Sequence, residues 1–298
     1  MRWPRFVASG RVGVFAPSSP FTEERFAPGV RALEALGYAV QIPEAARLSQ
    51  GYLAGSDEAR LTAFHALLSD PSIDVIMAAR GGYGLHRIVD RIDRRALRDA
   101  NKAIVGFSDI TALHLLCQRE GLCSVHGPVI TQLGELPPEA HQALALSLAG
   151  RADEIEYRSE EAAIRPGLAE GPLLGGCLSV ITPMLGSALL PSMEGAILLL
   201  EDVGEATYRI DRLLTHLHLA GVLGQVRGVA LGEFIGCNPR SPEEPTVQDV
   251  LRERFEKLGV PVLSGLPFGH GRRNLAVPLG APVVLDATAG TLRVSPRT

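Results

Sequence analysis

The amino-acid sequence predicts an α/β protein of two domains, in which the first half forms a parallel sheet covered by helices. In that half, short apolar runs alternate with segments of helical periodicity, a pattern typical of a parallel sheet with helices on both faces. In the second half the apolar runs are separated by fewer helices, which indicates a mixed sheet with fewer helices than in the first half. A chain of 298 residues also exceeds the size of most single cores, and this favours two domains.

The first half contains five apolar runs that end at turn signals, and we expect each to be a strand. They cover residues 11–15, 38–42, 73–79, 103–107 and 124–129. A helix carrying Leu33 is expected to end at Gly37, and Ser56 is a suitable cap for the next helix, which Pro71 terminates. A further helix begins near Ile110, and another covers residues 137–148.

The second half has strand-like runs at residues 196–200, 229–233, 283–285 and 291–294. Helical spacing covers residues 208–219 and 247–258, and an apolar segment runs to residue 185 after the glycines at 175 and 176. Residues 150–171 are polar and lack a sustained period, so the domain boundary is placed there. We therefore expect an N-terminal domain at 1–155, a linker at 156–172 and a C-terminal domain at 173–298.

Composition narrows the class of protein. The formal net charge of -4 gives no broad basic field, so nucleic acid is not an expected partner. No stretch approaches the roughly 18 apolar residues of a membrane span, and Pro4, Gly10 and Arg11 interrupt any signal-like N-terminal segment. The four cysteines show no C-x-x-C spacing, which is simplest to explain as reduced thiols in a cytoplasmic protein.

Ser108 lies where the strand at 103–107 gives way to a helix. A serine at such a sharp turn projects its hydroxyl from the carboxyl edge of the sheet, beside backbone N–H groups, which suits an acyl-transfer nucleophile. The second glycine of the G-x-S-x-G pattern is missing. Taken alone, the stretch is therefore explained more simply if Ser108 or Asp109 caps the helix.

The loop from Arg80 to Gly84 follows another buried strand of the same sheet. Because Gly81 and Gly82 have no side chains, their backbone can approach a ligand and turn N–H groups toward an anion. Together with the N–H of Asp109 they could form an oxyanion hole. The alternative is a tight turn. The loop is not a dinucleotide fingerprint, and no phosphate-binding G-x-x-x-x-G-K-[ST] motif occurs.

Glu201 ends a fully apolar strand, where a buried carboxylate must be paired and could orient a catalytic histidine. It could equally cap a helix or form a salt bridge, and Glu205 in the following loop is the competing acid. His270 lies between two glycines in a loop, a place that favours function over core packing. His86 and His126 are reserve candidates. No H-E-x-x-H motif or other metal-ligand spacing is present.

Several segments together resemble the LD-carboxypeptidase (muramoyltetrapeptide carboxypeptidase) family of serine peptidases, which also includes microcin C immunity peptidases. The segments are VFAPSSP, ARGGYG, VGFSDIT, HGP, GGCLSVIT with MLGS, LLLEDVGEATYRIDRLLTHL and GLPFGHGRRNLAVPLGA. The resemblance implies a catalytic triad of Ser108, Glu201 and His270, with an oxyanion hole at Gly82 and the N–H of Asp109. Cys177 departs from the family pattern, in which asparagine is expected at this position.

The resemblance further implies a flavodoxin-like or amidotransferase-like N-terminal domain and a smaller C-terminal β/β/α domain that carries the Glu and the His. It implies a homodimer, no metal and no organic cofactor. The expected substrate is a murein tetrapeptide, cut before its terminal D-Ala during peptidoglycan recycling. A bidentate arginine suits the free carboxylate of such a substrate. The candidate arginines are Arg80, Arg209, Arg212 and Arg272, and Gly81 and Tyr83 are further substrate-binding candidates.

Two other functions stay open. A microcin C-type immunity peptidase cleaves an amide beside a nucleotide and stacks the nucleobase on an aromatic side chain, often Trp. Trp3, at the extreme N-terminus, is the only Trp in the chain, so the murein substrate is favoured. A protein of a different class, a non-catalytic nucleotide-binding α/β protein, would use the loop from Arg80 to Gly84 for phosphate.

Overall fold

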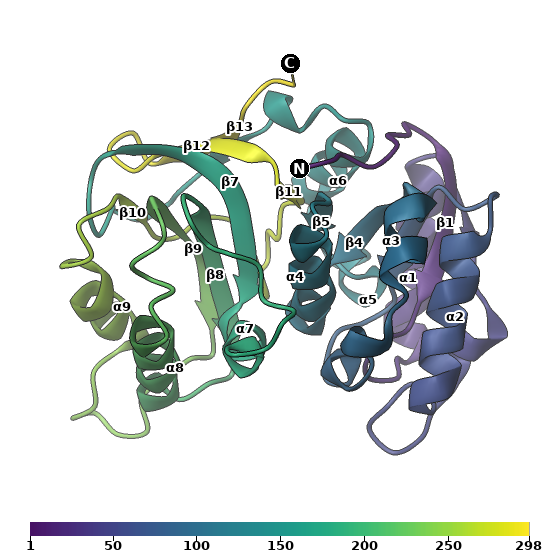
Figure 1. Ribbon diagram of the computed structural model, residues 1–298, viewed down its shortest axis with the longest axis horizontal. Helices are drawn as coiled ribbons and strands as arrows, with labels where there is room; N and C mark the ends of the chain where they lie inside the picture. Colours follow the sequence, from purple (N-terminus) through teal and green to yellow (C-terminus); the bar gives the residue numbers. More distant parts are fainter. Residues whose placement is uncertain (298) are drawn as a thin grey trace.

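A computed structural model describes residues 1–297 and contains two β-sheets (Figure 1). The first sheet has the strand order β11-β5-β4-β3-β1-β2, and every neighbouring pair is parallel except β11 with β5. Its strands are β1 (Gly10–Phe15), β2 (Tyr38–Gln41), β3 (Val75–Ala78), β4 (Ala103–Gly106), β5 (Ser124–His126) and β11 (Val277–Leu279). The five strands expected in the first half are therefore present.

Six helices belong to the first half of the chain. They are α1 (Glu23–Ala35), α2 (Asp57–Ser69), α3 (Arg94–Ala100), α4 (Thr111–Arg119), α5 (Ile130–Leu133) and α6 (Pro138–Leu148). The Ser56 hydroxyl accepts a hydrogen bond from the N–H of Ala59, so the expected cap of α2 is confirmed. Helix α3 was not expected, because only Leu97 among its residues is buried and the helix therefore has no apolar periodicity. Its start is defined by the capping side chain of Asp93.

The second sheet has the order β10-β9-β8-β7-β12-β13-β6. Its strands are β6 (Glu156–Arg158), β7 (Leu168–Cys177), β8 (Ile197–Val203), β9 (Gly228–Ile235), β10 (Val262–Leu263), β12 (Pro282–Asp286) and β13 (Thr291–Val294). The pairs from β7 to β10 are parallel and the others antiparallel, so the expected mixed sheet is confirmed. Its helices are α7 (Leu178–Ile181), α8 (Thr207–Leu219) and α9 (Val247–Phe255).

The segment 156–172, expected to be a linker, contains regular structure. Strand β6 pairs with β13, and the first part of β7 pairs with β12. These strands bury only part of their side chains, and their exposed positions are Arg158 in β6 and Leu168 and Glu170 in β7. A half-exposed strand of this kind gives a weak apolar signal. The second sheet therefore begins earlier along the chain than the sequence pattern indicated.

Strand β11 connects the two halves of the molecule. It comes from the C-terminal part of the chain but pairs with β5 of the first sheet, where Val277 lies opposite His126. Helix α4 lies between the two sheets and contacts β7 (Figure 1). As a result, the loop that precedes β11 is held close to the carboxyl ends of β4 and β5. No helix within residues 1–297 combines the length and the apolar character needed to cross a membrane.

Candidate active site

Ser108 has an unusual backbone conformation. Its φ of 62° lies in the left-handed region. Among residues 1–297, Asn101 is the one other non-glycine residue with a positive φ. Such strain is stored at functional sites more often than elsewhere. The N-cap position of α4 is Ile110, and no side chain caps that helix. The capping explanation for Ser108 and Asp109 is therefore not supported, and the strand–turn–helix arrangement expected here is present.

The loop after β3 lies directly against Ser108. A Cβ atom built on Gly81 would lie 2.9 Å from Cβ of Ser108, 3.0 Å from its Oγ and 3.6 Å from the backbone N of Asp109. Gly82 has a φ of +106°, and a Cβ there would lie 2.4 Å from Oγ of Ser19. Both positions therefore require glycine, and the loop backbone borders the hydroxyl and the following N–H group.

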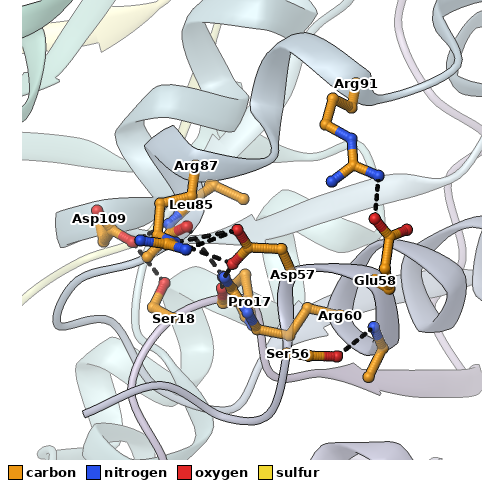
Figure 2. Close-up of polar contacts among 12 residues, drawn as sticks. Pro17, Ser18, Ser56, Asp57, Glu58, Arg60, Leu85, Arg87, Arg91 and Asp109 are labelled. Carbon is orange, nitrogen blue, oxygen red and sulfur yellow. Dashed lines mark hydrogen bonds and ion pairs between the residues drawn. The ribbon is translucent and has the colours of Figure 1, made fainter. Parts of the chain in front are cut away.

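The carboxylate of Asp109 ties two loops together beside the serine. Its Oδ2 accepts hydrogen bonds from Oγ of Ser18 at 2.6 Å and from the N–H of Leu85 at 2.8 Å (Figure 2). Burial raises the pKa of this carboxyl group. The side chain thus joins the loop after β1 to the loop after β3, a role that the sequence did not predict.

A second set of polar contacts holds the same two loops from the side of α2. The buried guanidinium of Arg60 donates to the carbonyl oxygens of Pro17 and of Gly84, the latter at 2.9 Å. It also pairs with Asp57, which in turn accepts a bond from Nε of Arg87 at 2.9 Å (Figure 2). The Gly84 end of the glycine loop is therefore tied to the loop after β1 through Arg60.

Glu201 and His270 contact each other. Oε2 of Glu201 lies 2.7 Å from Nδ1 of His270, and the Glu201 side chain is completely buried. Glu201 lies at a register shift between β8 and β9, where Leu200 and Asp202 are the flanking paired residues. The competing acid, Glu205, instead lies 3.3 Å from Nη1 of Arg209. Of these two acids, Glu201 is therefore the partner of the histidine.

The loop of His270 is anchored to the first half of the molecule. The imidazole packs against Phe107, with 4.7 Å between ring centroids. Oδ1 of Asn274 accepts a bond from the N–H of Gly269, and its Nδ2 donates to Oε1 of Gln132 on α5 at 2.7 Å. Neither amide side chain is among the candidates that the sequence suggests. Asn274 lies in the same GHGRRN run as His270, whereas nothing in the sequence marks Gln132.

A cavity of about 430 Å³ brings the candidate residues together. Its lining includes Ser108, His270, Arg80, Gly81 and Gly82. Two other candidates lie elsewhere. Tyr83 is exposed with its ring centroid 5.9 Å from that of Tyr52, and Arg272 lines a second cavity.

The two reserve histidines, His126 and His86, do not line the cavity of Ser108. His126 is completely buried with no hydrogen-bond partner for either ring nitrogen, and burial holds its pKa well below the usual range. Nε2 of His86 lies 3.1 Å from the carbonyl oxygen of Val180. Within residues 1–297, no group of three or more His, Cys, Asp or Glu side chains is arranged to hold a metal ion.

Comparison with known proteins identifies the family. A sequence model of the LD-carboxypeptidase N-terminal domain matches residues 12–127, and one of the C-terminal domain matches residues 170–285. The chain belongs to the LD-carboxypeptidase family. It is 33% identical to the murein tetrapeptide carboxypeptidase of Pseudomonas aeruginosa, in an alignment that covers 93% of each chain. Its identity to the microcin C7 self-immunity protein of Escherichia coli is 28%, with 92% of this chain and 90% of that protein covered.

A solved structure of a muramoyltetrapeptide carboxypeptidase also matches this chain. The muramoyltetrapeptide carboxypeptidase of Oxalobacter formigenes is 25% identical and superposes with a TM-score of 0.83. The match covers 95% of this chain and 97% of that one. Both domains of the LD-carboxypeptidase fold are therefore present in this chain.

Cys177 and Asp202 line the same cavity as Ser108. The Asp202 carboxylate accepts bonds from the N–H of Ser179 at 2.8 Å and from its hydroxyl at 3.1 Å. Burial raises the pKa of Asp202 to about 6. The Cys177 thiol lies 3.7 Å from Asp202, and burial raises its pKa well above the ordinary value. The thiol therefore stays protonated at neutral pH.

Proposed function

We propose that this protein is a serine carboxypeptidase that removes the terminal D-Ala from murein tetrapeptides by hydrolysing the L,D-amide bond. The observation that carries the proposal is the bond between Glu201 and His270 at the edge of the cavity that Ser108 also lines. A buried acid, a histidine and a strained serine are the three parts of an activated nucleophile. The murein tetrapeptide carboxypeptidase relative supports the choice of substrate.

In the first step, Oγ of Ser108 attacks the carbonyl carbon of the amide that precedes D-Ala. Nε2 of His270 takes the serine proton as the new C–O bond forms. The Glu201 carboxylate accepts the hydrogen bond from Nδ1–H, which fixes the ring and stabilises the imidazolium that results. The buried position of Glu201 strengthens this interaction because little solvent screens it.

The negative charge that develops on the carbonyl oxygen is stabilised by the N–H groups of Gly82 and Asp109. His270 then gives its proton to the leaving nitrogen, the C–N bond breaks, and D-Ala departs as a free amino acid. The remaining tripeptide is an ester of Ser108. A water molecule, deprotonated by His270, attacks this ester and releases the tripeptide carboxylate, while the proton returns to the serine.

Arg80 is assigned to the free carboxylate of the terminal D-Ala. It lines the cavity of Ser108, and a carboxypeptidase must recognise this charge next to the scissile bond. Arg209 and Arg212 lie instead around the ring of Tyr208 on α8, at 6.0 and 5.7 Å from its centroid. The backbone of Gly81 borders the same space.

The test is release of D-Ala from the peptide L-Ala-D-Glu-meso-diaminopimelate-D-Ala. The wild-type protein is expected to release it with and without EDTA, and Ser108→Ala is expected to lose the activity. Turnover retained by Ser108→Ala, or abolished by EDTA alone, would contradict the mechanism. The homodimer that the family resemblance implies is tested separately by sedimentation equilibrium.

The microcin-type alternative is tested on the same preparation with an aminoacyl-nucleotide amide. Trp3, which would have to stack the base, packs against Phe6 with 5.5 Å between ring centroids and is not among the residues that line the cavity. We expect no cleavage of the nucleotide conjugate. A non-catalytic nucleotide-binding protein would instead show nucleotide-dependent thermal stabilisation and release no D-Ala.

A further inference from the structure

A second cavity, of about 910 Å³, adjoins the catalytic one. The two share Arg25, Gln132 and His270 among their lining residues. Because the proposed catalytic histidine borders both spaces, a peptide bound with its scissile amide at Ser108 can place a neighbouring side chain in the second cavity. The volume is large enough for a long polar side chain.

Most charged groups around this second cavity are already paired. Arg25 lies 3.6 Å from Glu135. Nε of Arg273 lies 2.9 Å from Oε1 of Glu139 in an ion pair, and the same guanidinium also pairs with Glu160. Among the described residues, two charged side chains of the lining have no ionic partner, Glu233 and Arg272. The cavity therefore offers one unmatched negative charge and one unmatched positive charge.

The carboxylate of Glu233 has an oxygen that lacks a hydrogen-bond partner. Strand β9 places its carboxylate against the histidine loop, where a Cβ built on Gly271 would lie only 1.5 Å from Oε2. This Oε2 is buried and has no hydrogen-bond partner. Burial raises the pKa of the carboxyl group. A buried carboxylate oxygen without a partner is unfavourable, and a cationic ligand group placed in the cavity beside Glu233 would offset the charge of this carboxylate.

Arg272 supplies the opposite charge on the same loop. Its guanidinium is exposed and forms no ion pair with the described residues, so its donors are available to a ligand carboxylate. An ammonium and a carboxylate carried together on one carbon atom match this pair of side chains. The side chain of meso-diaminopimelate ends in that group, whereas lysine ends in an ammonium alone.

We propose that the second cavity binds the side chain of the third substrate residue, with Glu233 receiving its ammonium group and Arg272 its carboxylate. This assignment rests on the proposed function, because it places the third residue next to the scissile bond. With this arrangement the enzyme selects a third residue whose side chain ends in both an ammonium and a carboxylate over one that ends in an ammonium alone. Gly271 contributes by leaving room for the Glu233 carboxylate beside His270.

The test compares kcat/KM for D-Ala release from three tetrapeptides that differ only at the third residue. That residue is meso-diaminopimelate, its side-chain carboxamide, or L-lysine. A charge-assisted pair corresponds to about 10- to 100-fold in kcat/KM, so the wild type should prefer the first peptide by this factor. Arg272→Met should remove the preference and leave the lysine peptide within about twofold. Glu233→Gln should lower kcat/KM for all three peptides.

Arg119→Met and Glu194→Gln are matched controls, because both side chains are exposed, line neither cavity and form no ion pair among the described residues. Equal cleavage of the diaminopimelate and lysine peptides by the wild type would overturn the proposal, as would an equal loss on both in Arg272→Met. If no peptide is cleaved, the proposed function fails first. Binding of the uncleaved peptides to Ser108→Ala then decides the subsite, and equal affinities would overturn it.

Discussion

Nδ1 of His270 lies 2.7 Å from Oε2 of Glu201, a carboxylate with no solvent exposure. A buried carboxylate needs a donor, and the Nδ1–H group of the imidazole provides one. The bond fixes the tautomer in which Nε2 is the basic nitrogen. The residues come from β8 and from the loop before β11, so the relationship depends on the fold and not on proximity in sequence.

Replacing Glu201 by Gln should lower kcat on the order of 10⁴-fold, because the amide can neither hold the same tautomer nor stabilise the imidazolium. KM should change little, since the side chain is buried beneath the histidine. Steady-state kinetics of D-Ala release measures both values.

Glu205→Gln is the control for this substitution. Glu205 pairs with Arg209 at the start of α8 and not with His270, so loss of this partly exposed ion pair should change kcat by less than about threefold. A larger fall in kcat for Glu205→Gln than for Glu201→Gln would mean that the catalytic acid has been assigned to the wrong residue.

The elements around Ser108 could be predicted from the sequence because their signals are local. An apolar run, a break and helical spacing describe β4, the turn and α4, and caps such as Ser56 act within one turn of helix. The sequence also marks Glu201 and His270 as candidates, since one ends an apolar strand and the other lies between glycines. Their 2.7 Å contact needed the structure.

The parts that the sequence did not reveal are those fixed by distant contacts. Strand β11 crosses to the first sheet, and no periodicity states which sheet a short strand joins. The bond from Asn274 to Gln132 spans the two halves of the chain, and the Asp109 side chain joins two loops that precede it. The linker expected at 156–172 was misplaced because the half-exposed strands there mix polar and apolar residues and show no sustained apolar run.

Gly81→Ala tests how closely the glycine loop approaches the nucleophile. The new Cβ would lie 2.9 Å from Cβ of Ser108, a contact that forces the loop or the serine to move. A displacement of about 1 Å costs on the order of 10²-fold in rate, so kcat should fall by roughly that factor. In Gly224→Ala the nearest atom would be at 3.6 Å, and activity should be unchanged. Full activity in Gly81→Ala would show that this loop does not position the reacting groups.

Ser18→Ala tests the tie between the two loops. The hydroxyl donates to the buried carboxylate of Asp109 at 2.6 Å, and a hydrogen bond to a charged group contributes about 1.5–3 kcal/mol. We expect a loss of that size in the free energy of unfolding, measured with urea. Ser72 makes a similar bond to Asp70 at 2.7 Å on the exposed surface, so Ser72→Ala should cost about 0.5 kcal/mol or less. Equal losses in the two variants would mean that burial does not strengthen the Ser18 bond.

Asp202 should make the stability of the protein depend on pH. Burial raises its folded-state pKa from 3.8 to about 6, so between these values the folded protein binds the proton more tightly than the unfolded chain. The contribution of this group to the free energy of unfolding therefore decreases as pH rises through that window. Asp202→Asn removes this titration, and the groups that do not interact with Asp202 cancel in the comparison. The free energy of unfolding of the variant, relative to that of the wild type, should increase by about 1 kcal/mol from pH 5 to pH 8, as measured by urea unfolding at both pH values. A difference that does not change with pH would mean that Asp202 is already ionised at pH 5 in the folded protein, with its hydrogen bonds from Ser179 outweighing the effect of burial.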